Sequence, residues 1–268
     1  MNFIEFENSC AQYLNGRYSD TGCEFIVNGG MNSTAPDIVV KKNDKVICNI
    51  EVKEPNAQCG QFVAFANEET RSFIYSSRNH PSEPSKASLA ILEAMSKDFE
   101  RHRIPSANEL GLDKQLYYER IVDYYANYKQ CKFFMTRESV GTGSFIIFPT
   151  VCFKEYFDVT ACYRPKNSGS HNPNVKEKAV LPEILIRNGF ENHLLVRDGK
   201  YLNVQLDIDA GKCFIIEDQC RIQFRRIQPM LYRITTLSST KNANVIFSIS
   251  LKSSIMKSDW ETFEQVIK

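Results

Sequence analysis

Apolar residues near the start of the chain recur at three- and four-residue intervals. This spacing predicts an amphipathic helix over residues 2–15, which would end at Asn15-Gly16. The same periodicity predicts four more helices further along the chain, at residues 58–69, 86–102, 114–130 and 260–267.

Short runs of β-branched and aromatic residues predict strands between and after these helices. In the first half they cover residues 23–27, 37–41, 46–53 and 132–136, with 72–75 either a strand or a loop. The second half is dominated by such runs, at residues 145–148, 151–157, 194–197, 202–208, 213–216, 232–237 and 245–251. The polar, turn-rich segment 164–174 is the expected linker or mobile loop. The pattern predicts an α/β (α+β) protein, with a core and helical insertion at residues 1–150 and a β-rich region at 151–268.

The predicted strands at residues 37–41 and 46–53 carry the clearest alternation. A register in which paired residue numbers sum to 88 puts every apolar side chain on one face and sets Asp37 opposite Glu51. A two-residue loop at Asn43-Asp44 would mix the two faces. We therefore predict that this hairpin has a three-residue loop or a bulge.

Composition excludes several classes of protein. Hydrophobic residues at 43% and charged residues at 24% are typical of globular domains and exclude disordered and collagen-like chains. The nine cysteines form an odd set without a CxxC pair, so neither a disulfide framework nor a zinc knuckle is expected. The first residues lack a signal-peptide pattern, and no run approaches about 18 apolar residues. We expect a cytoplasmic protein with reduced thiols.

Charge is distributed unevenly along the chain. The 33 Lys and Arg residues nearly balance the 32 Asp and Glu residues, and the net charge of +1 creates no global attraction to nucleic acid. Residues 221–257 nevertheless contain no acidic residue and seven basic ones, namely Arg221, Arg225, Arg226, Arg233, Lys241, Lys252 and Lys257. Because phosphate contacts supply much of the affinity for DNA, this stretch is a predicted DNA-binding surface. The turn-rich segment adds Arg164, Lys166 and His171 to the DNA-binding candidates.

The open end of the hairpin carries the clearest chemistry, because Asp37, Glu51 and Lys53 share one face there. Adjacent carboxylates repel each other and lose hydration when buried, so a divalent cation would stabilise them. Mg²⁺ takes oxygen ligands and is commonly held by one or two carboxylates, with water and a substrate phosphate completing its octahedron. Lys53 would hold or polarise an attacking water. This set of groups suits metal-assisted attack on a phosphodiester.

The same segment resembles the PD-(D/E)xK nuclease superfamily, with Pro36-Asp37 as the first element and Glu51-Val52-Lys53 as the second. The resemblance implies a restriction-endonuclease-like mixed β-sheet core flanked by helices, and Mg²⁺-dependent cleavage of DNA. It implies that Asp37, Glu51 and the carbonyl of Val52 are metal ligands. It also implies that Lys53 orients the attacking water.

Three more residues are candidates for the same site. Members of this superfamily often contribute an acidic residue from the first helix, and Glu7 lies about 40° from Phe3 on the apolar face, whereas Glu5 points outward. The alternative for Glu7 is a solvated surface glutamate. Gln58 and Gln61, on the helix predicted after the motif, would reach the site or a DNA phosphate, with an ordinary polar helix face as the alternative.

The size and the two halves of the chain resemble a type II restriction endonuclease. This implies sequence-specific hydrolysis of double-stranded DNA, with the catalytic core at residues 1–150 and the DNA-recognition region at 151–268, and a cognate DNA methyltransferase as partner. A homodimer is expected, since a two-fold protein matches a palindromic site. The alternatives are a structure-specific, repair or transposon-end nuclease of the same superfamily and a non-catalytic DNA-binding protein. The intact Asp37, Glu51 and Lys53 argue against the last alternative.

Overall fold

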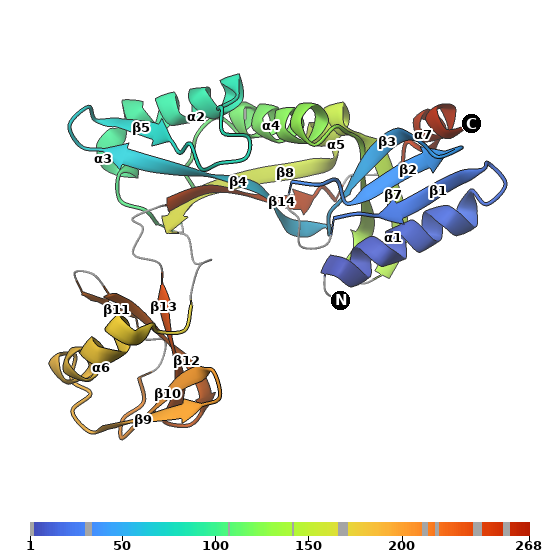
Figure 1. Ribbon diagram of the computed structural model, residues 1–268. Coiled ribbons are helices and arrows are strands. Elements are labelled where there is room, and N and C mark those ends of the chain that lie inside the picture. Colours follow the sequence, from blue (N-terminus) through green and yellow to red (C-terminus); the bar gives the residue numbers. More distant parts are fainter. Residues whose placement is uncertain are drawn as a thin grey trace. The chain divides into compact units, whose positions relative to one another are not determined.

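The chain forms two compact units (Figure 1). The first consists of Met1–Arg164 and Ala243–Lys268, and the second of Pro165–Asn242. The computed structural model describes residues 3–29, 34–106, 108–140, 142–165, 171–210, 214–217, 220–237, 243–253 and 258–268.

The first unit contains a five-stranded mixed sheet in the order β1-β2-β3-β6-β7. Neighbouring strands are antiparallel except for β3 and β6, which run parallel. The strands are β1 (Cys23–Val27), β2 (Ile38–Lys42), β3 (Lys45–Val52), β6 (Cys131–Ser139) and β7 (Thr142–Pro149). The expected mixed sheet is therefore present.

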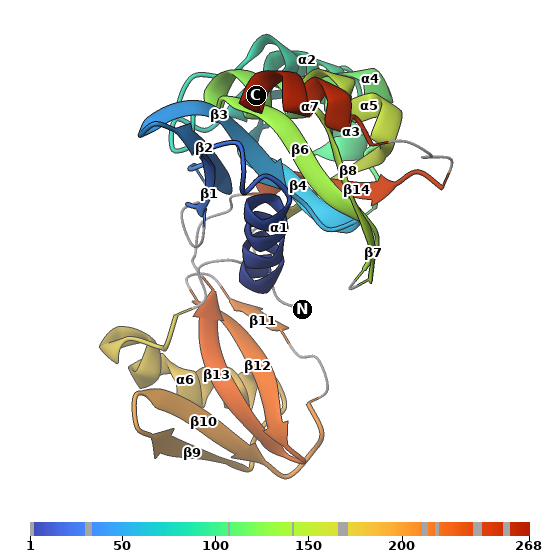
Figure 2. The ribbon, with the colours of Figure 1, turned by 90° about the vertical axis from the view of Figure 1, so that its right-hand side faces the viewer.

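Helices α1 (Phe3–Arg17) and α7 (Trp260–Ile267) share a core with the strands of this sheet, and both lie toward the viewer in Figure 2. Their buried apolar side chains pack with the apolar face of the hairpin formed by β2 and β3. The ring of Tyr18, directly after α1, lies 5.7 Å from that of Phe263 on α7. Both helices have the bounds that the periodicity predicts to within two residues, because an amphipathic helix needs only one apolar face to bury.

A second sheet of the first unit has the strand order β5-β4-β14-β8. Its strands are β4 (Asn56–Asn67), β5 (Ser72–Tyr75), β8 (Phe157–Pro165) and β14 (Ala243–Leu251). Figure 1 shows helices α2, α4 and α5 along one side of this sheet. The helical segments are α2 (Lys86–Lys97), α3 (Phe99–His102), α4 (Lys114–Val122), the π-helix η1 (Asp123–Tyr128), the 3-10 helix η2 (Thr150–Cys152) and α5 (Phe153–Tyr156).

The second unit is a five-stranded antiparallel sheet in the order β11-β12-β13-β10-β9, packed against one helix. The helix is α6 (Val175–Arg187), whose first turn is closed by a capping box between Asn174 and Glu177. The strands are β9 (His193–Asp198), β10 (Tyr201–Leu206), β11 (Phe214–Glu217), β12 (Cys220–Gln228) and β13 (Leu231–Leu237).

The hairpin of β2 and β3 has the predicted register. Ile38 pairs with Ile50 and Val39 with Asn49, so paired numbers sum to 88 at the open end. A bulge between Val40 and Lys41 then shifts the register, which allows a two-residue turn at Asn43-Asp44. Both turn residues have positive φ, of 51° and 62°, as this kind of tight hairpin turn requires. The prediction of a bulge is confirmed.

Several predicted elements are wrong. Residues 58–69 form most of strand β4 instead of a helix, because β14 and β5 pair with this segment on both sides. Residues 151–156 are helical and not extended, since Phe153 and Phe157 pack four residues apart with ring centroids at 5.1 Å. Helix α6 and strand β12 were not predicted.

The division of the chain also differs from the expected boundary at residue 150. Strands β8 and β14 lie in the same sheet as β4 of the first unit, so the chain leaves this unit after Arg164 and returns to it at Ala243. Within the described residues, no helix is long and apolar enough to cross a membrane.

Candidate active site

The open end of the hairpin brings two carboxylates together. Asp37 directly precedes β2, and Glu51 is the penultimate residue of β3. Their exposed fractions are 6% and 1%, so both side chains are buried. The backbone N–H of Val52 donates to Asp37 Oδ2 at 2.9 Å, which fixes the Asp37 carboxylate beside the end of β3. The apolar alternation of the hairpin produces this placement, since it turns Glu51 away from the face that α1 and α7 cover.

Lys53 joins the two carboxylates. Its Nζ donates to Glu51 Oε1 and, at 3.3 Å, to Asp37 Oδ2. It also donates to the carbonyl of Val52 at 3.0 Å. The structure thus brings together Asp37, Glu51, Lys53 and the Val52 carbonyl, which are the four groups of the predicted motif.

A second ammonium group enters the cluster from a distant part of the chain. Lys129, directly after η1, is 5% exposed and places Nζ 2.5 Å from Glu51 Oε2 and 3.8 Å from Asp37 Oδ1. The ring of Tyr125 lies near both ammonium groups, with its centroid 5.8 Å from Nζ of Lys53 and 5.3 Å from Nζ of Lys129.

Burial and charge act in opposite directions on these groups. Burial disfavours ionisation of Asp37, but the charges of Lys53 and Lys129 outweigh it and lower its pKa. At Glu51, burial exceeds the attraction of Lys53, and the neighbouring Asp37 adds repulsion, so the pKa of Glu51 is raised. Burial lowers the pKa of Lys53, but the attraction of Glu51 and Asp37 is larger and the net shift is upward. Lys53 is therefore a hydrogen-bond donor at neutral pH and not a proton acceptor.

The chain on either side of the cluster is held by further contacts. Asn28 and Gly29 donate backbone N–H groups to the Asp37 carbonyl at 2.8 and 3.2 Å. After Lys53, Glu54 accepts two hydrogen bonds from the guanidinium of Arg137, at 2.7 and 3.2 Å. A bidentate pair of this kind restrains the backbone that carries Lys53.

Glu7 of α1 approaches the same cluster. It is 6% exposed, so it is not the solvated glutamate of the alternative interpretation. A Cβ atom built on Gly29 would lie 2.8 Å from Asp37 Oδ1 and 3.4 Å from Glu7 Oε2, so the two carboxylates approach the same point. This position agrees with the helical phase that selected Glu7 over Glu5.

Gln58 and Gln61 lie on strand β4 and not on a helix. Gln61 Oε1 accepts hydrogen bonds from Gln58 at 3.2 Å and from Asn244 of β14 at 3.0 Å. These contacts tie Gln61 to the neighbouring strand, and the contacts that the structure gives it do not include Asp37, Glu51 or Lys53.

The predicted DNA-binding residues fall in both units. Arg225 of β12 pairs directly with Arg233 of β13, and the guanidinium of Arg233 lies 3.8 Å from the ring centroid of Tyr201. Like charges directly opposite each other on neighbouring strands repel, so this pair of arginines by itself destabilises the sheet. Arg226 is paired with Asp209 at 2.7 Å.

The remaining basic candidates have different surroundings. His171 lies 3.2 Å from Glu177, and Arg164 ends the first segment of the first unit. Arg221 lies on β12 opposite Leu237. In the first unit, Lys252 donates to the Lys154 carbonyl at 2.6 Å. Lys166, Lys241 and Lys257 lie outside the described residues.

The carboxylate cluster has the donor chemistry of a magnesium site. Asp37, Glu51 and the Val52 carbonyl supply hard oxygen ligands, and one or two carboxylates suffice for Mg²⁺ when water and phosphate complete the shell. Among the residues that the structure describes, no group of three or more His, Cys, Asp or Glu side chains forms a metal cage. Two buried carboxylates that require cationic compensation fit Mg²⁺, and in this structure the ammonium groups of Lys53 and Lys129 compensate them.

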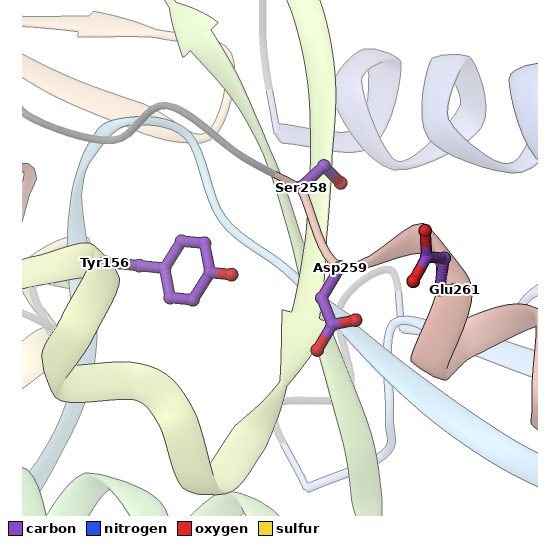
Figure 3. A pocket seen from close by; sticks show the side chains of 4 residues that line it. All are labelled: Tyr156, Ser258, Asp259 and Glu261. Atoms are coloured by element: carbon purple, nitrogen blue, oxygen red, sulfur yellow. The ribbon is translucent and has the colours of Figure 1, made fainter.

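A separate pocket of about 200 Å³ lies at the start of α7 (Figure 3). Tyr156, Ser258, Asp259 and Glu261 line it. Its polar groups already serve the fold: Ser258 Oγ accepts from Ile147 N at 2.8 Å, and Asp259 Oδ1 caps α7 by accepting from Thr262 N at 3.2 Å. The two carboxylates of this pocket would repel a phosphate, and none of the predicted site residues lines it.

Sequence reasoning missed Lys129 and Tyr125. Both residues lie shortly before β6, and the sequence predicts a strand there. The sequence contains no signal that β6 pairs in parallel with β3. A parallel neighbour is separated by a long connection, so its identity depends on packing and not on local pattern.

Comparisons with known proteins give one informative likeness. No family model matches the chain, and no curated protein matches it. Among solved structures, the chain is similar to one described as "HhaI endonuclease in Complex with DNA", with 34% sequence identity and a TM-score of 0.70. The alignment covers 100% of this chain and 99% of that chain, so the likeness extends over both units.

Proposed function

Because the chain belongs to the restriction endonuclease family of the HhaI endonuclease and has its restriction-endonuclease-like fold, we propose that it is a type II restriction endonuclease. The proposed reaction is Mg²⁺-dependent, sequence-specific hydrolysis of phosphodiester bonds in double-stranded DNA. The observation that carries the proposal is the buried convergence of Asp37, Glu51 and Lys53 at one end of the mixed sheet.

The proposed roles follow from the contacts of each group. Asp37, Glu51 and the Val52 carbonyl would hold the cation through oxygen ligands, and on the same residues we propose membership of the PD-(D/E)xK superfamily. When bound, Mg²⁺ supplies Lewis-acid activation of the phosphodiester and of a water. Lys53, held protonated by its carboxylate neighbours, would orient the water and offset the negative charge that develops on phosphorus. Glu7 is proposed to support this cluster from α1.

DNA is the proposed substrate on two grounds. The similar endonuclease was solved in complex with DNA. In this chain, Arg225 and Arg233 are adjacent on β12 and β13, and neighbouring cations of this kind suit an anionic phosphate backbone. Arg164, Lys166, His171, Arg221, Arg226 and Lys241 stay predicted contacts. The homodimer and the methyltransferase partner also stay predictions, of which sedimentation of the purified protein tests the first.

The experiment is incubation of the purified protein with plasmid and bacteriophage DNA, with Mg²⁺ or with EDTA. We expect discrete bands with Mg²⁺ and intact DNA with EDTA. A smear, or cutting confined to branched DNA, would instead favour a structure-specific or repair nuclease. If the protein shifts DNA in a gel but cleaves none with any divalent cation, the remaining hypothesis is a non-catalytic DNA-binding protein.

The Lys53→Met variant tests the site. We expect cleavage to fall by at least about a hundredfold, because charge stabilisation of this kind is worth two to three powers of ten, while DNA binding in a gel shift is retained. The control is Lys45→Met, which removes an exposed lysine at the turn of the same hairpin and should cleave as the wild type does. Equal cleavage by both variants would refute the proposed site.

A further inference from the structure

Lys129 gives the cluster one more positive charge than the predicted motif requires. Lys53 and Lys129 balance the Asp37 and Glu51 pair with two positive charges, all largely removed from water. Glu7 brings a third carboxylate to the edge of the cluster. Both ammonium groups are therefore needed while no divalent cation is bound, because an uncompensated buried charge is costly.

A divalent cation at the same oxygens would change this balance. With Lys53 and Lys129 both in place, the positive charges would outnumber the three carboxylates of Asp37, Glu51 and Glu7 by one. Nζ of Lys129 lies 2.5 Å from Glu51 Oε2 and 3.8 Å from Asp37 Oδ1, so it uses the carboxylate oxygens that a cation would need. Lys129 and the cation therefore compete for these oxygens, and an additional anion is required before both can remain in the site.

The position of Lys129 is built by a rare backbone element. The π-helix η1 (Asp123–Tyr128) ends directly before Lys129. The backbone N–H of Lys129 donates to the Tyr124 carbonyl at 2.9 Å. The next residue, Gln130, has a φ of 55°, which turns the chain into β6. A single π-helical turn is frequent at functional sites, and this one aims a lysine at buried carboxylates.

We propose that Lys129 is a positioning residue that holds the carboxylate pair until a DNA phosphate draws its ammonium away, so that divalent cation binding is weak in the free protein and strong on DNA. The proposal rests on the proposed nuclease function, in which DNA and a divalent cation meet at this site. The coupling is reciprocal, since a ligand that strengthens the binding of a second ligand is itself bound more tightly in its presence.

The test uses the full-length protein and Ca²⁺, which takes the same class of oxygen ligand. Calorimetric titration of the DNA-free protein should give Ca²⁺ affinity at least about tenfold higher for Lys129→Met than for the wild type, because a unit charge at about 4 Å acts strongly on a dication. Lys129→Arg, which keeps the charge, should remain weak. Lys132→Met, an exposed lysine on β6, is the matched control and should equal the wild type.

A second readout measures DNA affinity by gel shift over a Ca²⁺ series. Ca²⁺ should strengthen DNA binding in the wild type, and this effect should shrink at least about tenfold in Lys129→Met, in parallel with the first measurement. If Lys129→Met is partly unfolded, Ca²⁺ must restore its melting temperature by more than it raises that of the wild type. A variant that Ca²⁺ does not restore overturns the proposal.

The outcomes separate this inference from the proposed function. If the wild type cuts DNA with Mg²⁺ but Lys129→Met binds Ca²⁺ no more tightly than the wild type, the role of Lys129 is wrong and the nuclease stands. If the wild type cuts no DNA yet Lys129→Met binds Ca²⁺ more tightly, the proposed nuclease function is wrong, but Lys129 still competes with a cation for the carboxylates. Equal Ca²⁺ affinity of Lys129→Met and Lys129→Arg counts against the proposal in either case.

Discussion

Individual residues of the cluster depend on close backbone packing. Gly29 faces Asp37 so closely that a Cβ atom there would lie 2.8 Å from Asp37 Oδ1 and 3.0 Å from its Cα. Backbone cannot yield as a flexible side chain does, so only a residue without Cβ fits at this position. Glycine at 29 thus sets the position of Asp37, a proposed metal ligand.

Gly29→Ala should therefore displace Asp37. We expect kcat/KM for DNA cleavage to fall about tenfold to a hundredfold, since a misplacement of about 1 Å in a catalytic group has effects of this size. The matched control is Gly16→Ala in α1, where a Cβ atom would meet nothing within 4 Å and the φ is not positive. Steady-state cleavage of plasmid DNA measures both variants, and equal rates would show that the packing around Asp37 is more tolerant than its distances indicate.

At the level of elements, α7 secures the face of the sheet opposite Glu51. Phe263 of α7 is fully buried, and its ring centroid lies 5.0 Å from Phe133 of β6 and 6.2 Å from Phe25 of β1. The helix thus packs against β1 and β6, which flank the hairpin of β2 and β3 that presents the carboxylates. Because the hairpin alternates strictly, burial of one face fixes the direction of the other.

Phe263→Ala should destabilise the first unit by about 3–5 kcal/mol, the usual cost of a large cavity in an aromatic core. Urea unfolding followed by tryptophan fluorescence measures the change, since the single Trp260 lies on the same helix. Gln265→Ala, at an exposed position of α7, should change the unfolding free energy by less than about 0.5 kcal/mol. A small effect at Phe263 would mean that α7 is dispensable for the sheet.

At the level of the whole molecule, the second unit is an insertion between two neighbouring strands. Strand β8 leads out of the first unit and β14 leads back into it, and the two are adjacent in one sheet. Lys252, just after β14, donates its N–H to the Tyr156 carbonyl, just before β8, at 2.9 Å, so the strands run antiparallel. The exit at Arg164 and the return at Ala243 therefore lie at the same end of the strand pair.

Replacement of Pro165–Asn242 by a short Gly/Ser turn should leave the first unit folded, because a tight hairpin can join the two strands. We expect a cooperative thermal transition by circular dichroism. DNA affinity should fall in a gel shift. Its salt dependence should also weaken, by about one unit in the slope of log affinity against log salt for each phosphate that Arg225, Arg233 and their neighbours bind in the whole protein. Absence of cooperative melting would show that the second unit is needed for folding.

The candidate site was predicted in part. The register and the bulge of the hairpin follow from the sequence because each strand carries its own apolar face. This register brings Asp37 to the end of β3 that carries Glu51. Helical phase likewise selected Glu7. Residues 58–69 were misread as a helix, because their apolar spacing fits both periods and only pairing with β14 and β5 decides between them.

The sequence by itself determined which short segments bury one face, and hence the hairpin that carries Asp37, Glu51 and Lys53, because burial of alternating side chains is a local property. Tertiary structure alone decided that β6 runs parallel beside β3 and that η1 delivers Lys129 to Glu51. The contact between Lys129 and Glu51 joins residues 78 apart in the chain. Such pairs form through packing of the whole sheet, and no local pattern encodes them.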